Sequence, residues 1–131
     1  MSIPLASDCL ALVAARKSAL QARLPAYFCL GDVADLGFLD VQASFALDMG
    51  CLHSLAPENK TLYAQSLARR MISGGLYLLY GFDSDPNGQG GPSGFDVDEV
   101  RTRFGPGFEL RWRRPSTQGT RPVAWYLLER R

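Results

Sequence analysis

Apolar positions recur every three or four residues in two parts of the chain, which predicts helices there. The first helix follows a capping residue at 7–8 and is stopped by Pro25. The second begins at Pro57, a residue favoured at the first helical position, and we expect Gly74-Gly75 to end it. Asp96 and Glu99 have the spacing of a capping box, so a third, shorter helix is predicted to follow them.

Five other runs of apolar residues have the length and composition of strands: 26–31, 43–48, 76–82, 108–113 and 123–128. The run at 108–113 alternates between apolar and polar residues, which is typical of a strand with one face in water. The run at 123–128 is continuously apolar, so we expect both of its faces to be covered. Together with the helices, this order predicts an α/β domain of packed layers that ends in an antiparallel β-hairpin.

The composition is that of one globular domain over residues 1–131, with 47% hydrophobic and 21% charged residues. The net charge of +1 argues against a dedicated nucleic-acid binder, which would need a basic surface. However, residues 101–131 carry eight Arg and two Glu. These arginines indicate either a phosphate patch or a solvated hairpin, and we favour the hairpin. The acidic residues that we expect to pair with them are Asp83, Asp85, Asp96, Asp98 and Glu99.

Three cysteines (Cys9, Cys29 and Cys51) and one histidine (His53) provide too few suitably spaced ligands for a closed zinc site. No basic segment precedes the first apolar run, so no secretory signal is predicted. The apolar runs are also much shorter than the ~20 residues that a membrane-spanning helix needs. We therefore expect a reduced, soluble, cytoplasmic protein without a metal and without a membrane partner.

Polar or small residues follow three of the predicted strands, at 31–33, 48–53 and 81–83. Ligands of open α/β sheets bind at the carboxyl ends of parallel strands, so these segments are candidates for a binding site. The pattern over residues 26–131 resembles the class I S-adenosylmethionine-dependent methyltransferases of the bacterial small-molecule type. The segments that carry the resemblance are Phe28-x-x-Gly31-Asp32-Val33, Phe45-Ala-Leu-Asp48-Met-Gly-Cys-Leu-His53, Gly74-Gly75-Leu-Tyr-Leu-Leu-Tyr80-Gly-Phe82 and Arg121-Pro-Val-Ala-Trp-Tyr-Leu-Leu-Glu-Arg130.

This resemblance implies a Rossmann-like sheet in which the last strand lies antiparallel beside the strand at 76–82. It also implies a glycine-rich turn, G-x-G-x-G, near the start of the domain, and the sequence has no such motif before residue 74. Residues 1–6 look like the tail of the family's second strand, with Pro4 about where an acid for the ribose hydroxyls would stand. We therefore expect an N-terminally truncated domain that binds S-adenosylmethionine weakly.

The resemblance also implies roles for individual residues. Asp32 corresponds to the residue that accepts a hydrogen bond from the adenine amino group, with the Val33 amide beside it; the alternative is an aspartate that only turns the chain. Asp48 corresponds to the residue nearest the sulfonium, whose positive charge favours a carboxylate; the alternative is a cap for the following turn. Met49 and Gly50 would lie beside it against the cofactor.

His53 is a candidate general base toward the methyl acceptor, because the pKa of an ordinary histidine lies near neutrality. The alternative is a structural hydrogen bond. The glycine-rich segment at 83–94 lacks the Lys-Ser/Thr of a phosphate loop, so we interpret it as a flexible loop.

The leading hypothesis is a truncated methyltransferase that moves a methyl group from S-adenosylmethionine to a small-molecule acceptor, a reaction that depends mainly on proximity and orientation. The alternative is an inactive remnant that acts as an interaction module or as a partner subunit. The sequence does not identify the acceptor.

Without the family's first strands, the strand at 43–48 would have an open edge, and the run Ala-Ser-Phe-Ala-Leu has no charge or proline to protect it. Either the strand at 26–31 pairs with it directly, or two chains meet edge to edge. We favour the second arrangement and expect a homodimer.

Overall fold

The computed structural model describes residues 6–84 and 94–131, with side chains described from Leu12 onward. The expectations for residues 1–5 and for most of the loop at 83–94 therefore lie outside the described residues. Two short helical turns lie in the connections between the longer elements: η1 (Leu36–Phe38) and η2 (Leu52–Ser54). No helix in the described ranges is long and apolar enough to cross a membrane.

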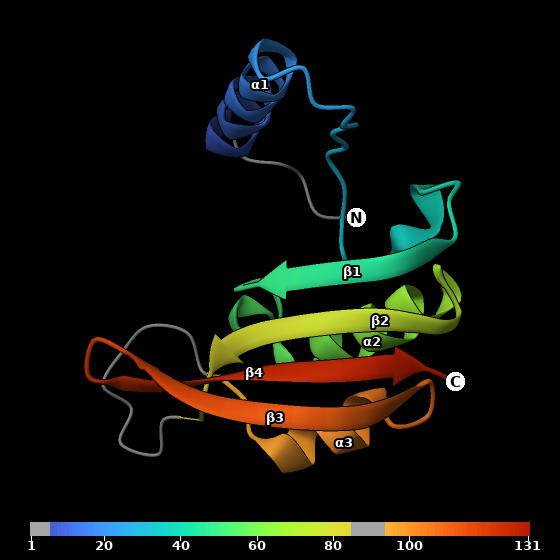
Figure 1. Ribbon diagram of the computed structural model, residues 1–131, viewed down its shortest axis with the longest axis vertical. Helices are drawn as coiled ribbons and strands as arrows, with labels where there is room; N and C mark the ends of the chain where they lie inside the picture. Colours follow the sequence, from blue (N-terminus) through green and yellow to red (C-terminus); the bar gives the residue numbers. More distant parts are fainter. Residues whose placement is uncertain (1–5, 85–93) are drawn as a thin grey trace.

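The sheet has four strands in the spatial order β1-β2-β4-β3 (Figure 1). These strands are β1 (Ala43–Met49), β2 (Met71–Phe82), β3 (Phe108–Gln118) and β4 (Arg121–Arg130). β1 and β2 are parallel, whereas β4 lies antiparallel between β2 and β3. The predicted α/β class and the terminal hairpin are confirmed, as is the insertion of the last strand beside the strand at 76–82.

Two of the three helices cover one face of this sheet: α2 (Pro57–Arg69) and α3 (Val97–Phe104) (Figure 1). The core lies between them and the helix-facing side chains of β2 and β4. Its largest fully buried side chains are Tyr77, Tyr126, Phe95, Phe104 and Phe108.

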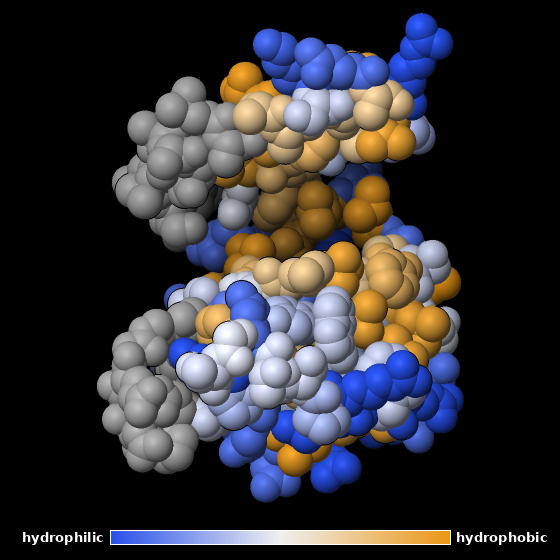
Figure 2. Space-filling model, turned by 60° about the vertical axis from the view of Figure 1, so that its left-hand side comes forward, coloured by the Kyte–Doolittle hydropathy of each residue, from blue (hydrophilic) through white to orange (hydrophobic). Residues whose placement is uncertain are grey.

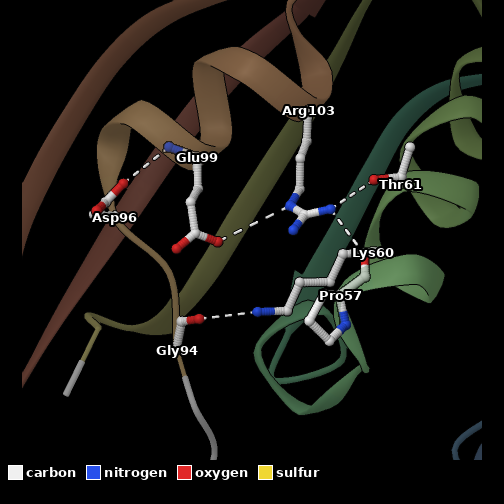
Figure 3. Close-up of polar contacts among 7 residues, drawn as sticks. All are labelled: Pro57, Lys60, Thr61, Gly94, Asp96, Glu99 and Arg103. Carbon is white, nitrogen blue, oxygen red and sulfur yellow. Dashed lines mark hydrogen bonds and ion pairs between the residues drawn. The ribbon is translucent and has the colours of Figure 1, made fainter. Parts of the chain in front are cut away.

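Hydrogen bonds hold α3 and the residue that leads into it against α2 (Figure 3). Asp96 caps α3 by accepting the Glu99 N–H at 2.9 Å, as the capping box predicted. Arg103 donates to the Pro57 carbonyl at 2.8 Å and lies 3.9 Å from the Glu99 carboxylate. The buried Lys60 Nζ donates to the Gly94 carbonyl at 2.9 Å. Burial lowers the pKa of Lys60, and the charge of Glu99 opposes this effect.

The prediction that Gly74-Gly75 ends the second helix is wrong. α2 ends at Arg69, and the Arg70 carbonyl accepts the Ala43 N–H at 2.8 Å, which brings the chain straight into the sheet. Gly74 has φ +83° and lies where the β1–β2 register shifts, between the pairs Ala43–Met71 and Phe45–Leu76. The two glycines therefore form an irregularity inside β2, because glycine adopts positive φ without steric cost.

The predicted strand at 26–31 is also wrong. These residues have no regular secondary structure, and Tyr27 is 99% exposed. The preceding helix α1 (Ala6–Gln21) forms as predicted, but it lies apart from the sheet (Figure 1). A strand needs the edge of a neighbouring strand to satisfy its backbone, and residues 26–31 are not among the strands that pair in this sheet, so the outer edge of β1 is left without them.

Within residues 6–84 and 94–131, no helix covers the second face of the sheet. Phe45, Leu47 and Met49 of β1 project from this face and are 54%, 55% and 62% exposed. On β4, Trp125 and Leu127 are only half-buried, so the expectation that both faces of 123–128 are covered is wrong for these two residues. A continuously apolar strand is typical of a sheet that is covered on both faces. In the described residues, helices cover only one face of this sheet, so the side chains on the other face stay partly exposed.

Candidate functional site

Asp48 lies at the carboxyl end of β1 and its side chain is buried, on the face that α2 covers. Oδ1 accepts the Cys51 N–H at 2.8 Å, and Oδ2 accepts the Leu52 N–H at 3.1 Å. The hydroxyls of Tyr63 and Tyr77 also donate to Oδ2, at 2.9 Å and 3.4 Å. Asp48 thus connects the end of β1 to the turn that follows, to α2 and to β2.

Three of these contacts are to Oδ2 and one is to Oδ1, and the two tyrosine hydroxyls also lie 3.0 Å apart, so one of them can donate to the other. All four donors belong to the fold itself, and the carboxylate is buried on the face that α2 covers. The geometry agrees with the alternative interpretation, a cap for the turn after β1. Burial, followed by the negative charge of Asp48, raises the pKa of Cys51 to about 11 and raises that of Tyr63 as well.

His53 lies in η2, beyond Asp48, and is also buried. Its Nδ1 accepts the Phe82 N–H at 3.1 Å, and its ring stacks on the Phe82 ring with centroids 4.7 Å apart. Two glycines leave room for the imidazole: a Cβ at Gly50 would lie 3.2 Å from Nε2, and one at Gly81 would lie 3.3 Å from Nδ1. The site therefore joins the carboxyl ends of β1 and β2.

The hydrogen bond from Phe82 determines what His53 offers a ligand. An Nδ1 that accepts a hydrogen bond carries no proton, so in the neutral ring the proton is on Nε2. Nε2 can then donate a hydrogen bond but cannot take up a proton. This geometry supports a hydrogen-bond donor at this end of the sheet, and the general-base role of His53 stays a prediction.

The pKa of His53 gives a testable pH dependence. Burial lowers it from its usual value of 6.5, against the opposing charge of Asp48, while Arg121 and Lys60 lower it further. The unfolded chain therefore binds a proton at higher pH than the folded chain does, so stability should be full above about pH 6.5 and decrease below it. Because His53 is the sole histidine, His53→Asn should flatten this slope in urea denaturation between about pH 7 and 5.5. An unchanged slope would show that another group titrates there.

Asp32 and Val33 lie elsewhere, in the segment between α1 and η1. Asp32 Oδ1 accepts the Ala34 N–H at 2.9 Å, a hydrogen bond that is typical of an aspartate in a turn. Val33 packs against the core. The structure brings together Asp48, Gly50 and His53 at one strand end, whereas the Asp32 carboxylate accepts from Ala34 within its own turn.

The sequence did not reveal the partners of Asp48 and His53. Tyr63 and Tyr77 lie in apolar runs and give no separate sign of a site. A buried tyrosine hydroxyl usually has a hydrogen-bond partner, and that is the signal that could have pointed to Asp48. Arg121 was not predicted at the site, yet its guanidinium lies 4.4 Å from the centre of the Phe82 ring.

No protein-family model and no curated protein matches the chain. Solved structures do match it. A structure from work on the conversion of a disulfide bond into a thioacetal group during echinomycin biosynthesis has a TM-score of 0.75 and 19% identity. The match covers 92% of this chain and 62% of that one.

A second match is the 1,6-didemethyltoxoflavin-N1-methyltransferase of Burkholderia thailandensis, solved with 1,6-didemethyltoxoflavin and S-adenosylhomocysteine, at a TM-score of 0.70 and 19% identity. It covers 87% of this chain and 56% of that one. The N-methyltransferase NodS of Bradyrhizobium japonicum, solved with S-adenosylhomocysteine, has a TM-score of 0.69, 8% identity and coverage of 89% and 61%. The chain thus spans about three fifths of the length of these proteins. Its fold is that of the class I S-adenosylmethionine-dependent methyltransferases.

Proposed function

We propose that this chain functions as part of an S-adenosylmethionine-dependent methyltransferase that acts on a small-molecule acceptor. The observation that carries the proposal is the sheet order β1-β2-β4-β3 with an antiparallel β4. Structures of the same fold were solved with S-adenosylhomocysteine, one of them together with 1,6-didemethyltoxoflavin. The small-molecule class of the acceptor rests on the resemblance, and the cytoplasmic location that we include in the proposal rests on the sequence pattern.

The residues present fit only part of the cofactor. Asp32 and Val33 would hold the adenine, and Met49 and Gly50 end the strand beside which the cofactor would lie. Asp48 does not fit the sulfonium, since its carboxylate is buried on the helix side and accepts hydrogen bonds from groups of the fold. The sequence also has no G-x-G-x-G before residue 74. We therefore derive no methyl-transfer step and expect weak binding.

The second candidate function is a non-catalytic interaction module or partner subunit. The observation that favours it is the combination of an Asp48 that accepts hydrogen bonds from within the fold and an exposed apolar face on β1. Cofactor binding distinguishes the two candidates, because a module that only binds a protein has no need of it.

The test is a titration of the ¹⁵N-labelled chain with S-adenosylhomocysteine up to about 10 mM, with amide shifts followed at Asp32, Val33, Met49 and Gly50. We expect a dissociation constant of about 1 mM or weaker, near −4 kcal/mol. Asp32→Ala should weaken binding further, because it leaves the adenine donor without an acceptor. Asp40→Ala, which removes an exposed carboxylate, is the control.

Three outcomes are informative. Shifts confined to the four amides and reduced by Asp32→Ala support the enzyme proposal. A folded chain that shows no shift at the highest concentration contradicts it and favours the interaction module. Low-micromolar binding would support the proposed function but contradict the expected weakness.

A further inference from the structure

The two outer edges of the sheet differ in how they are protected. On the outer strand β3, exposed arginines and Pro115 make pairing with another chain unfavourable. On β1, the only charged residue is Asp48, and its carboxylate is buried on the helix side. β1 therefore has neither an exposed charge nor a proline to keep its edge unpaired, and its register irregularity is confined to its start, between Ala43 and Phe45.

The register of β1 shows which of its peptide groups are open. Ala43 donates its N–H to the Arg70 carbonyl across the β1–β2 pair. Peptide groups of a strand alternate between its two sides. Those of Ser44, Ala46 and Asp48 consequently point away from β2, toward an edge where no strand in the described ranges pairs.

The surroundings of this edge are apolar. Phe45, Leu47 and Met49 are more than half exposed on one side of β1. Figure 2 shows a hollow between the sheet and the arm (residues 6–31), with hydrophobic residues gathered on both of its walls. The arm itself has exposed apolar side chains, among them Val13, Leu20 and Leu24. An unpaired strand edge beside such a hollow would be stabilised by a further strand.

We propose that the β1 edge pairs with β1 of a second copy of this chain, in an antiparallel arrangement about a two-fold axis at Ala46. The pairing is self-complementary: Ala46 faces Ala46 of the partner subunit, and Ser44 faces Asp48 of the partner subunit. Both of these are pairs whose peptide groups point toward the open edge, so each exchanges two hydrogen bonds. Phe45 then lies opposite Leu47 of the partner subunit, on the apolar face.

The area involved sets the strength that we expect. From their exposed fractions, the side chains of Phe45, Leu47 and Met49 offer roughly 300 Å² per subunit, below the ~800 Å² per partner of a standard stable interface. The apolar side chains of the arm add to this area. The dimer should therefore be weak, with a dissociation constant in the range of about 10–100 μM.

The first experiment is light scattering behind size exclusion across a tenfold concentration range. The wild-type mass should rise toward that of a dimer, and hydrogen exchange at Ser44, Ala46 and Asp48 should slow as concentration rises. Ala46→Pro removes a donor from the open edge but none from the β1–β2 pair, so it should remain monomeric. Ala46→Val keeps the N–H and should still dimerise, which makes it the matched control.

The second experiment tests the register. Phe45→Glu and Leu47→Lys each place a charge on an exposed position, so each variant should fold, as circular dichroism will check, and should dimerise at least tenfold more weakly. A mixture of the two variants places Glu opposite Lys, and it should restore association as a heterodimer. Restoration in the mixture alone is specific to an antiparallel pair with residue 45 opposite residue 47.

A monomer at every concentration overturns the proposal, whether the hollow is filled by the arm of the same chain or by a different protein. A wild-type dimer that both Ala46→Pro and the charged variants leave intact overturns the proposed surface. Neither result bears on cofactor binding, which the amide titration measures separately.

Discussion

Replacing Asp48 with alanine is expected to destabilise the folded chain by about 3–5 kcal/mol. The variant removes one carboxylate that accepts from the N–H groups of Cys51 and Leu52 and from the hydroxyls of Tyr63 and Tyr77. Tyr77 is fully buried and Tyr63 and Leu52 nearly so. The two hydroxyls lie 3.0 Å apart, so one can donate to the other, but the remaining hydroxyl and the Leu52 N–H would lose their acceptor in a place that water reaches poorly. Each such donor costs about 1–3 kcal/mol.

Urea denaturation followed by circular dichroism measures this loss. Tyr63→Phe removes one hydroxyl and should cost about 1 kcal/mol, whereas the exposed Asp40→Ala should change stability by less than about 0.5 kcal/mol. Asp48→Asn should fall between these variants and Asp48→Ala, because one oxygen is kept. A loss of under about 1 kcal/mol for Asp48→Ala would show that the carboxylate does not stabilise the fold as described. It would favour a role of Asp48 toward the cofactor instead.

Gly94→Ala is expected to have the second largest effect, about 3–4 kcal/mol. A Cβ at this position would lie 2.6 Å from the Phe82 carbonyl oxygen and closer still to that of Asp83, which are backbone atoms that cannot rotate away. The residue also has φ +73°, where an L side chain is strained. Moving Gly94 would disturb the Lys60 hydrogen bond and the start of α3 together (Figure 3).

Gly119→Ala is the matched control for this variant. Gly119 has a similar φ of +63°, but no atom lies within 4 Å of the Cβ it would gain. It should therefore show the cost of the backbone conformation alone, about 1–2 kcal/mol. Equal losses for the two variants in thermal unfolding would mean that the crowding at Gly94 is relieved by a small backbone shift.

The parts of the fold that the sequence predicted are those whose signal is local. Pro57 and the Asp96–Glu99 capping box begin helices through contacts within one turn, and both helices begin where predicted. The strands near 43–48, 76–82, 108–113 and 123–128 have both a strand-like pattern and a partner in the sheet, and all four form. The run at 26–31 has the pattern without the partner, and it remains irregular.

Gly74-Gly75 shows why a correct local pattern can have a different consequence. The pair does mark a break in regular structure, but the break is a register shift within β2, because the helix ends before it, at Arg69, and the Arg70 carbonyl already accepts from Ala43 of β1.

The candidate site likewise depends on residues that a local pattern does not include. Asp48 and His53 stand at a strand end as their positions suggest, yet what they do is determined by Tyr63, Tyr77 and Phe82, which are distant in sequence.

The burial of Lys60 makes the chain unusually simple for chemical cross-linking. The sequence has two lysines, and Lys17 is exposed on α1 whereas Lys60 is 3% exposed and its amine is bound to the Gly94 carbonyl. An amine-reactive bifunctional reagent applied to the folded protein should thus find Lys17 as its one reactive lysine side chain. Any lysine-to-lysine cross-link detected by mass spectrometry must then join the Lys17 residues of two different molecules.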